Sequence, residues 1–337
     1  MRIRFIITTA WLVLATALGP PAWAWGPEGH HTVGAMADRL LAGTVAEQQV
    51  RVLLGGMSLE QASVWADCVK GVRPGTGFDY PESGKYPECA PFETDAGRAA
   101  MGDYVRRNDS NCDREPTEES CHRQYHYADV AIQHNRYATG FTGARRDDVV
   151  AAIAAAVHVL KNEPAAPPFS FADKREALLV LAHLVGDIHQ PLHVGAVYLS
   201  VRGTRVDPDA DTLDPETETR GGNRLWLGGP GTANLHSRWD AVPTSLTVAL
   251  LTDMLIQQAR AVPVTPGLAA DWSTAWATDT VRIARQAFVG VRFGAKKAGR
   301  WPTKLPTGYA ARINALKREQ VVKAGAHLAQ LLQAVWP

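Results

Sequence analysis

The sequence has almost no net charge, because 35 lysines and arginines stand against 34 aspartates and glutamates, for a formal charge of +1 over 337 residues. A chain without a large basic field does not attract nucleic acid over its whole surface. Any polyanionic ligand must therefore be held by local cations. The sequence also lacks the alternating strand and helix patterns of doubly wound α/β folds.

Cysteine is scarce, and the four cysteines are Cys68, Cys89, Cys112 and Cys121. None of them forms the Cys-x2-Cys pair that is typical of structural zinc sites. An even number of cysteines in an exported protein favours two disulfides. Three pairings are possible, and short loops favour Cys68–Cys89 with Cys112–Cys121, but the sequence leaves the choice open.

The chain begins with an apolar stretch, residues 5–18, which is too short for a membrane span. A basic start precedes it, and the small-x-small site at residues 22–24 follows it. We therefore predict a signal peptide at residues 1–24, cleaved between Ala24 and Trp25, and a secreted or periplasmic protein with no membrane span after cleavage. Residues 25–337 are predicted to form one domain.

Cleavage at this bond has a chemical consequence, because it makes Trp25 the first residue of the mature chain. A free α-amine has a pKa of about 7.7–8.0, so a metal ion can displace its proton near neutral pH. The amide nitrogen of the uncleaved chain cannot act in this way. The simpler interpretation is an export signal with no further role for Trp25.

Helical periodicity dominates the mature chain, so we expect a mainly α fold with a single compact multi-helix domain. The predicted helices span residues 32–41, 58–70, 147–161, 172–189, 243–261, 273–293 and 308–336. Ser58 and Gln61 have the spacing of a capping box. Long irregular loops are expected at residues 71–121 and 202–222.

The second of these loops is acidic, with Asp207, Asp209, Asp211, Asp214, Glu216 and Glu218. Part of this stretch imitates a calcium-binding loop. Thr212, however, stands where such a loop needs glycine, and prolines interrupt it. An acidic surface insertion is therefore favoured over a calcium site.

Potential metal ligands recur at helical spacing. His183-x3-Asp187-x5-His193 forms the core of the pattern, and His236-x3-Asp240 repeats the four-residue interval. Residues four apart leave the same face of a helix. A single histidine of this kind is more often a core or surface residue than a ligand, so only the joint pattern indicates metal binding.

Three upstream residues, His30, Asp67 and His126, complete the pattern. Imidazole and carboxylate are the ligands that zinc uses when a coordination position stays open for water. With Trp25 there are nine potential ligands, and their spacing predicts three zinc sites. A cluster of three zinc ions is suited to attack on phosphate esters. The other histidines, His31, His122, His134, His158, His189 and His327, are interpreted as structural.

The motifs together resemble a known family. They are WGPEGH at 25–30, SVWAD at 63–67, YHYAD at 125–129, HLVGDIHQPLHVG at 183–195, GGN at 221–223 and NLHSRWD at 234–240. As a set they are similar to the zinc-dependent, single-strand-preferring nucleases of fungi, plants and bacteria. That family shares its fold with the zinc-dependent bacterial phospholipases C.

The resemblance implies the following ligand sets. One zinc would be held by Asp67, His126, His183 and Asp187. A second would be held by the Trp25 amine and carbonyl, His30 and Asp187, which bridges the two ions. A third would be held by His193, His236 and Asp240. Three Zn²⁺ are thus the expected cofactors.

The resemblance also implies substrate-binding and catalytic residues. Asp129 matches the general base or water-orienting carboxylate, and Lys70 matches a cation near the scissile phosphate. Tyr127 stands where the family places an aromatic ring for base stacking, and Asn223, preceded by Gly222, where it places a base-binding amide. The implied function is a secreted endonuclease that cuts RNA and single-stranded DNA to 5′-phosphorylated products, with 3′-nucleotidase activity in addition.

Two alternatives remain at this stage. The first is a phospholipase C on the same fold, although Tyr127 and Asn223 favour a nucleotide. The second is an exported zinc-binding protein without catalysis, which would need the ligands but not Asp129. No obligate protein partner is inferred from the sequence.

Overall fold

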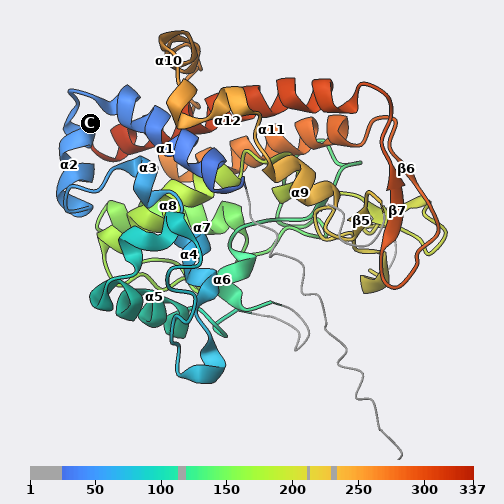
Figure 1. The fold of residues 1–337 in the computed structure, drawn as a ribbon, viewed down its shortest axis with the longest axis horizontal. Coiled ribbons are helices and arrows are strands. Elements are labelled where there is room, and N and C mark those ends of the chain that lie inside the picture. The colour runs from blue at the N-terminus through green and yellow to red at the C-terminus, as the bar shows by residue number, and fades with distance from the viewer. Residues whose placement is uncertain (1–24, 113–118, 211–212, 229–233) are drawn as a thin grey trace, which may run out of the picture.

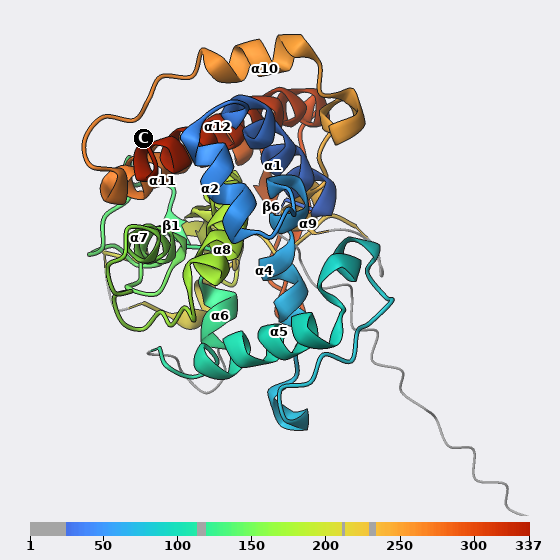
Figure 2. The ribbon, with the colours of Figure 1, turned by 90° about the vertical axis from the view of Figure 1, so that its left-hand side faces the viewer.

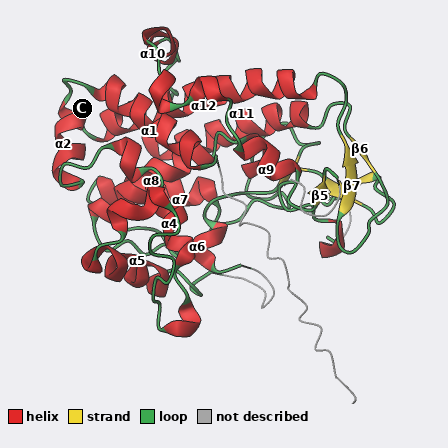
Figure 3. Cartoon of the chain, viewed as in Figure 1, coloured by secondary structure: helices red, strands yellow, loops and turns green. Residues whose placement is uncertain are grey.

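Helices dominate the computed structural model, which describes residues 25–112, 119–210, 213–228 and 234–337 (Figure 1; Figure 3). The predicted signal peptide and its cleavage site, as well as Asp211 and Thr212 of the acidic loop, lie outside the described residues. No helix within the described ranges is both long and apolar enough to cross a bilayer. The prediction of a mainly α fold is confirmed.

Twelve α-helices lie within the described residues, many of them short. Their bounds are α1 (Pro27–Leu41), α2 (Val45–Leu53), α3 (Leu59–Ala62), α4 (Trp65–Cys68), α5 (Asp95–Arg107), α6 (Cys121–Gln124), α7 (Val149–Leu160), α8 (Lys174–Asp187), α9 (Leu235–Asp240), α10 (Asp253–Arg260), α11 (Trp272–Ala287) and α12 (Tyr309–Val335). Helix α12 packs along α1, and α10 lies outside α12 at one edge of the molecule (Figures 1 and 2).

Helix α8 lies in the core and contacts α7, α1, α4 and α12. The Asp173 carboxylate caps its N-terminus by accepting a hydrogen bond from the Glu176 amide at 2.8 Å. Twelve of its fourteen residues are buried. A helix that is covered on every side is held by packing rather than by its intrinsic helical propensity.

The predicted continuous helix at 58–70 is wrong, because the chain breaks into α3, α4 and a 3-10 turn at Val69–Gly71. The predicted capping box of Ser58 and Gln61 is present at the start of α3. At the break, the Ser63 hydroxyl bonds the carbonyls of His30 and Glu60, both at 2.8 Å. Such local bonds compete with helix continuation.

Other predicted boundaries also need correction. Residues 243–261 form two 3-10 turns before α10, because the Thr252 side chain caps a new helix there by bonding the Leu255 amide at 3.3 Å. The helix predicted at 273–293 ends at Ala287, and the chain turns into a strand. The stretch 71–121 is not wholly irregular, since it contains α5, which Thr94 caps.

The strands are short and form three small sheets. β1 (Val130–Ala131) pairs in parallel with β2 (Gly195–Ala196), and β3 (Tyr198–Leu199) pairs with β4 (Arg205–Val206). The third sheet has the order β5-β7-β6, from β5 (Leu225–Trp226), β7 (Trp301–Lys304) and β6 (Arg292–Phe293), and lies at the end of the molecule away from α2 (Figure 1).

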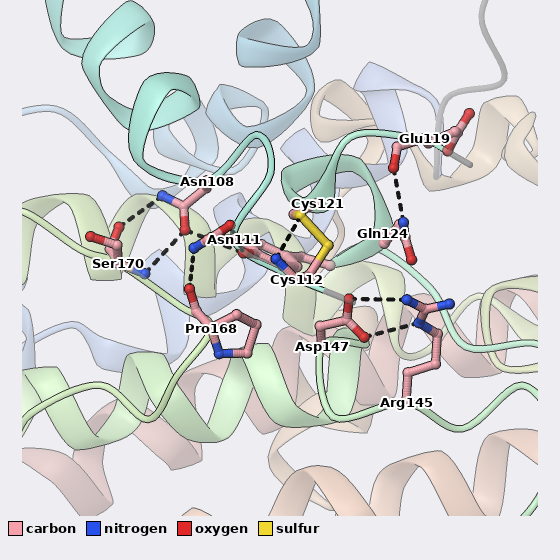
Figure 4. Close-up of a disulfide and its surroundings, with 11 residues drawn as sticks. Asn108, Asn111, Cys112, Glu119, Cys121, Gln124, Arg145, Asp147, Pro168 and Ser170 are labelled. Atoms are coloured by element: carbon pink, nitrogen blue, oxygen red, sulfur yellow. Dashed lines mark hydrogen bonds and ion pairs between the residues drawn. A yellow bond between two sulfur atoms is a disulfide. The ribbon is translucent and has the colours of Figure 1, made fainter. Parts of the chain in front are cut away.

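Two disulfides stabilise the region around α4 and α6. They join Cys68 to Cys89 and Cys112 to Cys121, the pairing that the short loops favoured. Near the second bridge, the Asn108 side chain donates to Ser170 O at 2.8 Å and accepts from Ser170 N at 3.0 Å (Figure 4). The disulfide to Cys121 and the hydrogen bond from the His122 amide to Asn108 O at 2.7 Å hold α6 in place shortly before His126.

Candidate metal centre

Helix α8 presents His183 and Asp187 on one face, with His183 Nε2 3.1 Å from Asp187 Oδ2. His126, which follows α6, brings its Nδ1 to 2.9 Å from the same oxygen and 3.1 Å from His183 Nε2. Asp67, on α4, places its Oδ1 3.6 Å from His183 Nε2. Four side chains from three separate segments therefore meet at one buried point.

The other oxygen of Asp187 faces a second group. His30, on α1, has its Nε2 3.4 Å from Asp187 Oδ1, and its ring stacks on that of His183 with 3.8 Å between centroids. This close approach requires Gly186, since a Cβ there would lie 2.8 Å from His30 Nδ1. Asp187 therefore lies between two adjoining groups of potential ligands, with His126 at its Oδ2 and His30 at its Oδ1, and His183 belongs to both groups.

A third group consists of His193, His236 and Asp240, all buried. His193 lies on the 3-10 turn Pro191–His193, and the other two lie on α9 with His236 Nε2 3.7 Å from Asp240 Oδ1. The Gln190 side chain donates to Asp240 Oδ1 at 2.8 Å. One carboxylate oxygen is thus held in place while the other stays available.

Backbone carbonyls orient three of the histidines. His183 donates through Nδ1 to Ser63 O at 2.7 Å, His193 to His126 O at 2.8 Å, and His236 to Gly221 O at 2.8 Å. A proton on Nδ1 leaves Nε2 as the free lone pair. This arrangement is the one by which proteins fix the tautomer of a metal-ligating histidine.

Buried polar atoms without a hydrogen-bond partner point to a bound cation. Among the described residues these atoms include both ring nitrogens of His30, Asp67 Oδ2, Asp187 Oδ1, His193 Nε2 and Asp240 Oδ2. Buried acceptors are normally paired, so a concentration of unpaired ones needs an explanation. Imidazole and carboxylate donors suit zinc, and the residues present fit that ion.

At His30, His126, His236 and Asp187 the electrostatics favour the forms that bind a cation, whereas burial raises the pKa of Asp240 well above its usual range. Burial lowers the pKa of His30 to about 4 and those of His126 and His236 to about 3, so these imidazoles are neutral. Burial opposes ionisation of Asp187, but His183 and His193 nearby hold its pKa well below the usual range. Neutral imidazole and ionised carboxylate are the ligating forms.

Asp129 lies beside the third group. Its buried Oδ1 has no hydrogen-bond partner among the described residues. Burial, with Glu218 nearby, raises its pKa to about 7, and the Gly221 amide donates a hydrogen bond to it. Gly221, with φ of 55°, connects Asp129 to His236, whose Nδ1 bonds the Gly221 carbonyl.

The remaining predicted residues surround the same centre. Lys70 Nζ forms an ion pair with Asp67 Oδ1 at 2.7 Å, on the side of the first group. Tyr127 is half-buried between His126 and Asp129 in the chain. The Asn223 amide donates to Arg220 O at 3.1 Å and accepts from Asn234 at 3.3 Å, and Gly222 before it is buried.

Trp25 is fully buried against helix α8. Its indole Nε1 donates to Gly186 O at 2.9 Å, and the amide of Gly26 donates to Asp240 O at 2.9 Å. Trp25 therefore lies next to Gly186, the neighbour of Asp187 in the chain, and Gly26 lies next to Asp240 of the third group. The bond before Trp25 joins it to residues outside the described part.

Sequence reasoning did not identify Gln190 and the Ser63 carbonyl, which position Asp240 and His183. Gln190 stands inside the ligand-rich run HQPLH, so its place between two ligands was an available signal. No signal in the sequence pointed to the Ser63 carbonyl, because its position depends on the break between α3 and α4. His134, interpreted as structural, lies beside Asp207 and Asp209 at the surface, with its Nε2 2.6 Å from Asp209 Oδ2.

A helical body around three adjoining groups of buried histidine and aspartate defines a protein that can hold several metal ions. Residues 25–336 match the S1/P1 nuclease family, and the chain belongs to that family. It is also similar to endonuclease 2 of Arabidopsis thaliana, with 27% identity over 244 residues. The match covers 72% of this chain and 62% of that protein, so the chain spans less than two thirds of the relative's length.

Proposed function

We propose that this protein is a secreted zinc-dependent endonuclease that hydrolyses RNA and single-stranded DNA to 5′-phosphorylated products and also acts on 3′-nucleotides. The observation that carries the proposal is the close approach of three buried ligand groups, two of which adjoin at His183 and Asp187. Membership of the S1/P1 nuclease family supports the phosphodiester as the bond that is cut.

Three zinc ions would be held by the groups described above. The first set is Asp67, His126, His183 and Asp187, the second is Trp25, His30 and Asp187, and the third is His193, His236 and Asp240. Bound zinc lowers the pKa of water toward 7 and neutralises phosphate charge. The Trp25 amine completes the second set once the signal peptide is removed, which couples export to activation.

Asp129 acts as the general base in this proposal. Its carboxylate has an unpaired, buried oxygen, and the Gly221 amide restricts its orientation. A pKa near neutrality suits a group that must accept a proton from the attacking water at working pH. In this proposal Asp129 takes up that proton without being a metal ligand itself.

Three further residues bind the substrate in this proposal. Lys70 supplies a positive charge to a non-bridging phosphate oxygen. The half-buried ring of Tyr127 offers a face for one unpaired base, and stacking of this kind contributes about 1–3 kcal/mol per base. Asn223, whose amide is held by Arg220 O and Asn234, recognises the base edge.

The test uses the mature protein beginning at Trp25, with zinc content measured by elemental analysis. We expect about three zinc ions per chain, cleavage of denatured DNA, and loss of cleavage after chelation that zinc restores. Asp129→Asn should keep the metal and lose about 10²–10⁴ in kcat. Turnover of phosphatidylcholine without turnover of denatured DNA would contradict the proposal and favour a phospholipase C.

The role of the N-terminus needs its own comparison. A variant with one additional residue before Trp25 should bind about two zinc ions and lose most activity, because its Trp25 nitrogen is an amide. A matched variant with one additional residue after Pro337 controls for the altered length. Retention of a third zinc ion in the N-terminal variant would refute the amine as a ligand.

A further inference from the structure

The sheet β5-β7-β6 borders a cleft of about 570 Å³ that belongs to none of the ligand groups. Its lining includes Trp226 of β5, Arg292 and Phe293 of β6, and Lys304 of β7. Figures 1 and 3 place this sheet at the end of the molecule opposite α2. A volume of this size is within the range of ligand-binding pockets.

The part of the chain that forms β6 and β7 is strongly basic although the whole chain is nearly neutral. Between Asp279 and Glu319 there are ten lysines and arginines and no aspartate or glutamate. They are Arg282, Arg285, Arg292, Lys296, Lys297, Arg300, Lys304, Arg312, Lys317 and Arg318. Lys317 is buried, and the other nine form a local excess of positive charge of the kind found on polyanion-binding surfaces.

Two of these cations oppose one another directly. In the antiparallel pairing of β6 with β7, Arg292 is the register partner of Lys304. Both side chains are exposed, and neither has an ion pair with a carboxylate among the described residues. Lys296 differs, since it pairs with Glu216 at 2.6 Å. Like charges directly opposite on two strands destabilise a sheet, so an anion between Arg292 and Lys304 would relieve an existing repulsion.

An aromatic ring lines the same cleft. Trp226 is half-buried and is the register partner of Pro302, so its side chain lies on the same face of the sheet as Arg292 and Lys304. Phe293, which follows Arg292 on β6, points to the opposite face. Single-stranded nucleic acid is bound by surfaces that combine cations for the backbone with aromatic faces for unpaired bases. The cleft has both components, whereas a site for a free inorganic anion has no need of an aromatic ring.

The cleft adjoins the metal centre along the chain. Asn223, proposed to bind a base, precedes Trp226 by three residues, and three residues span at most about 11 Å. Asn234 connects the two places, because its amide donates to Asn223 and it is the bridge partner of Trp226. A nucleic acid strand advances about 3.4 Å per stacked nucleotide, so a few nucleotides cover this distance.

We propose that this cleft is a second binding subsite for single-stranded nucleic acid. A phosphate lies between Arg292 and Lys304, and an unpaired base lies against Trp226, a few nucleotides from the scissile bond. The inference rests on the proposed nuclease function and adds a preference for substrates long enough to occupy both places. It also explains how a nearly neutral protein retains a polyanion.

The charge reversal Arg292→Glu tests the subsite. It places a carboxylate opposite Lys304, which replaces a repulsive cross-strand pair by an attractive one while removing the anion site. The zinc-loaded mature protein should keep or raise its Tm. Its KM for a deoxythymidine dodecamer, relative to that for a dinucleotide, should rise about tenfold, the effect of one lost favourable contact. Stability and long-substrate binding therefore change in opposite directions, which a purely structural role would not produce.

Binding is measured separately from cleavage, by fluorescence anisotropy with a nuclease-resistant phosphorothioate dodecamer. The slope of log affinity against log salt should fall by about 1.4 in Arg292→Glu, because two cations no longer meet phosphate and each contributes about 0.7 for a single strand. Arg51→Glu on α2, at the opposite end of the molecule, is the matched charge-reversal control. Trp226→Leu should weaken binding, and Trp226→Phe, which keeps an aromatic face, should restore most of it.

Each outcome distinguishes the subsite from the proposed function. Cleavage of both substrates with an unchanged dodecamer KM and salt slope in Arg292→Glu would overturn the subsite and leave the nuclease intact. Failure of the wild-type protein to cleave either substrate would overturn the nuclease, while the anisotropy still reports on the cleft. Loss of binding to anionic lipid vesicles in Arg292→Glu, with no change for the dodecamer, would assign the cleft to a membrane surface and contradict the proposal.

Discussion

The residues around Asp187 and the group of His193, His236 and Asp240 are positioned in different ways. Asp187 and His183 stand on α8, a helix with twelve of fourteen residues buried. The third group stands on a 3-10 turn and on α9, which has six residues. Side chains on a packed helix are held by the core, whereas those on short turns depend on individual hydrogen bonds.

Those bonds can be identified around α9. Gln190 holds the Asp240 carboxylate, and the Gly221 carbonyl holds the His236 ring. Lys317 on α12 is buried and donates to the carbonyls of Arg238 and Ala241 at 2.7 and 2.6 Å, at the C-terminal end of α9. One centre therefore combines a region fixed by packing with a region fixed by polar contacts. Different substitutions should disturb the two regions separately.

The largest effect is expected from Asp187→Asn. This carboxylate serves two groups, so its loss should remove about two of the three expected zinc ions and lower kcat/KM by more than the 10–100-fold typical of an outer-shell residue. Asp240→Asn is the matched change in the other region and should remove one. Elemental analysis with kinetics on denatured DNA measures both, and equal metal loss in the two variants would contradict the sharing of Asp187.

A smaller and more local effect is expected from Gln190→Leu. The substitution leaves Asp240 Oδ1 without its 2.8 Å hydrogen bond, and loss of such a partner typically weakens metal binding about 10–100-fold. Only the third group should be affected. Competitive titration with a zinc chelator should show one weakened site and two unchanged sites, and weakening of all three would mean that the regions are not separable.

Gly186→Ala tests the region fixed by packing. The added Cβ would lie 2.8 Å from His30 Nδ1, so His30 and α8 must move apart. Overpacking of this kind typically costs about 1–3 kcal/mol. We expect a lower free energy of unfolding by denaturant titration, and a weakened second group with an unchanged third. Unaltered stability would indicate that α8 and α1 can separate without loss.

The smallest effect is expected at His122, a buried residue outside both regions. Burial, with Arg123 nearby, lowers its folded pKa to about 3. The unfolded chain takes up this proton below a pKa of about 6.5, so folding loses stability as pH falls below that value, by about 2 kcal/mol at pH 5. At pH 7 the contribution is absent.

His122→Leu should therefore lose about 2 kcal/mol less than the wild type between pH 7 and pH 5, in denaturant unfolding of the two proteins side by side. His158→Leu, which changes a half-buried histidine at the end of α7, is the control. An identical pH dependence of stability in the wild type and in His122→Leu would show that His122 does not cause the loss of stability below pH 6.5.

Much of the helical fold follows from local patterns. The predicted helices at 147–161, 172–189 and 308–336 correspond to α7, α8 and α12 within a few residues. The errors at 58–70 and 243–261 have one cause: side-chain hydroxyls of Ser63 and Thr252 bond nearby backbone and redirect the chain. Whether such a bond forms depends on partners distant in sequence, such as the His30 carbonyl.

The residues themselves specified the chemistry of the candidate site. Four-residue spacing puts His183 with Asp187, and His236 with Asp240, on single helix faces, because helical geometry is local. Tertiary structure alone decided that Asp67, His126 and His30 meet around His183. It also decided that the Ser63 carbonyl orients His183, and that Arg292 faces Lys304. Long-range convergence and strand register depend on the packing of the whole chain, and no short stretch of sequence encodes that packing.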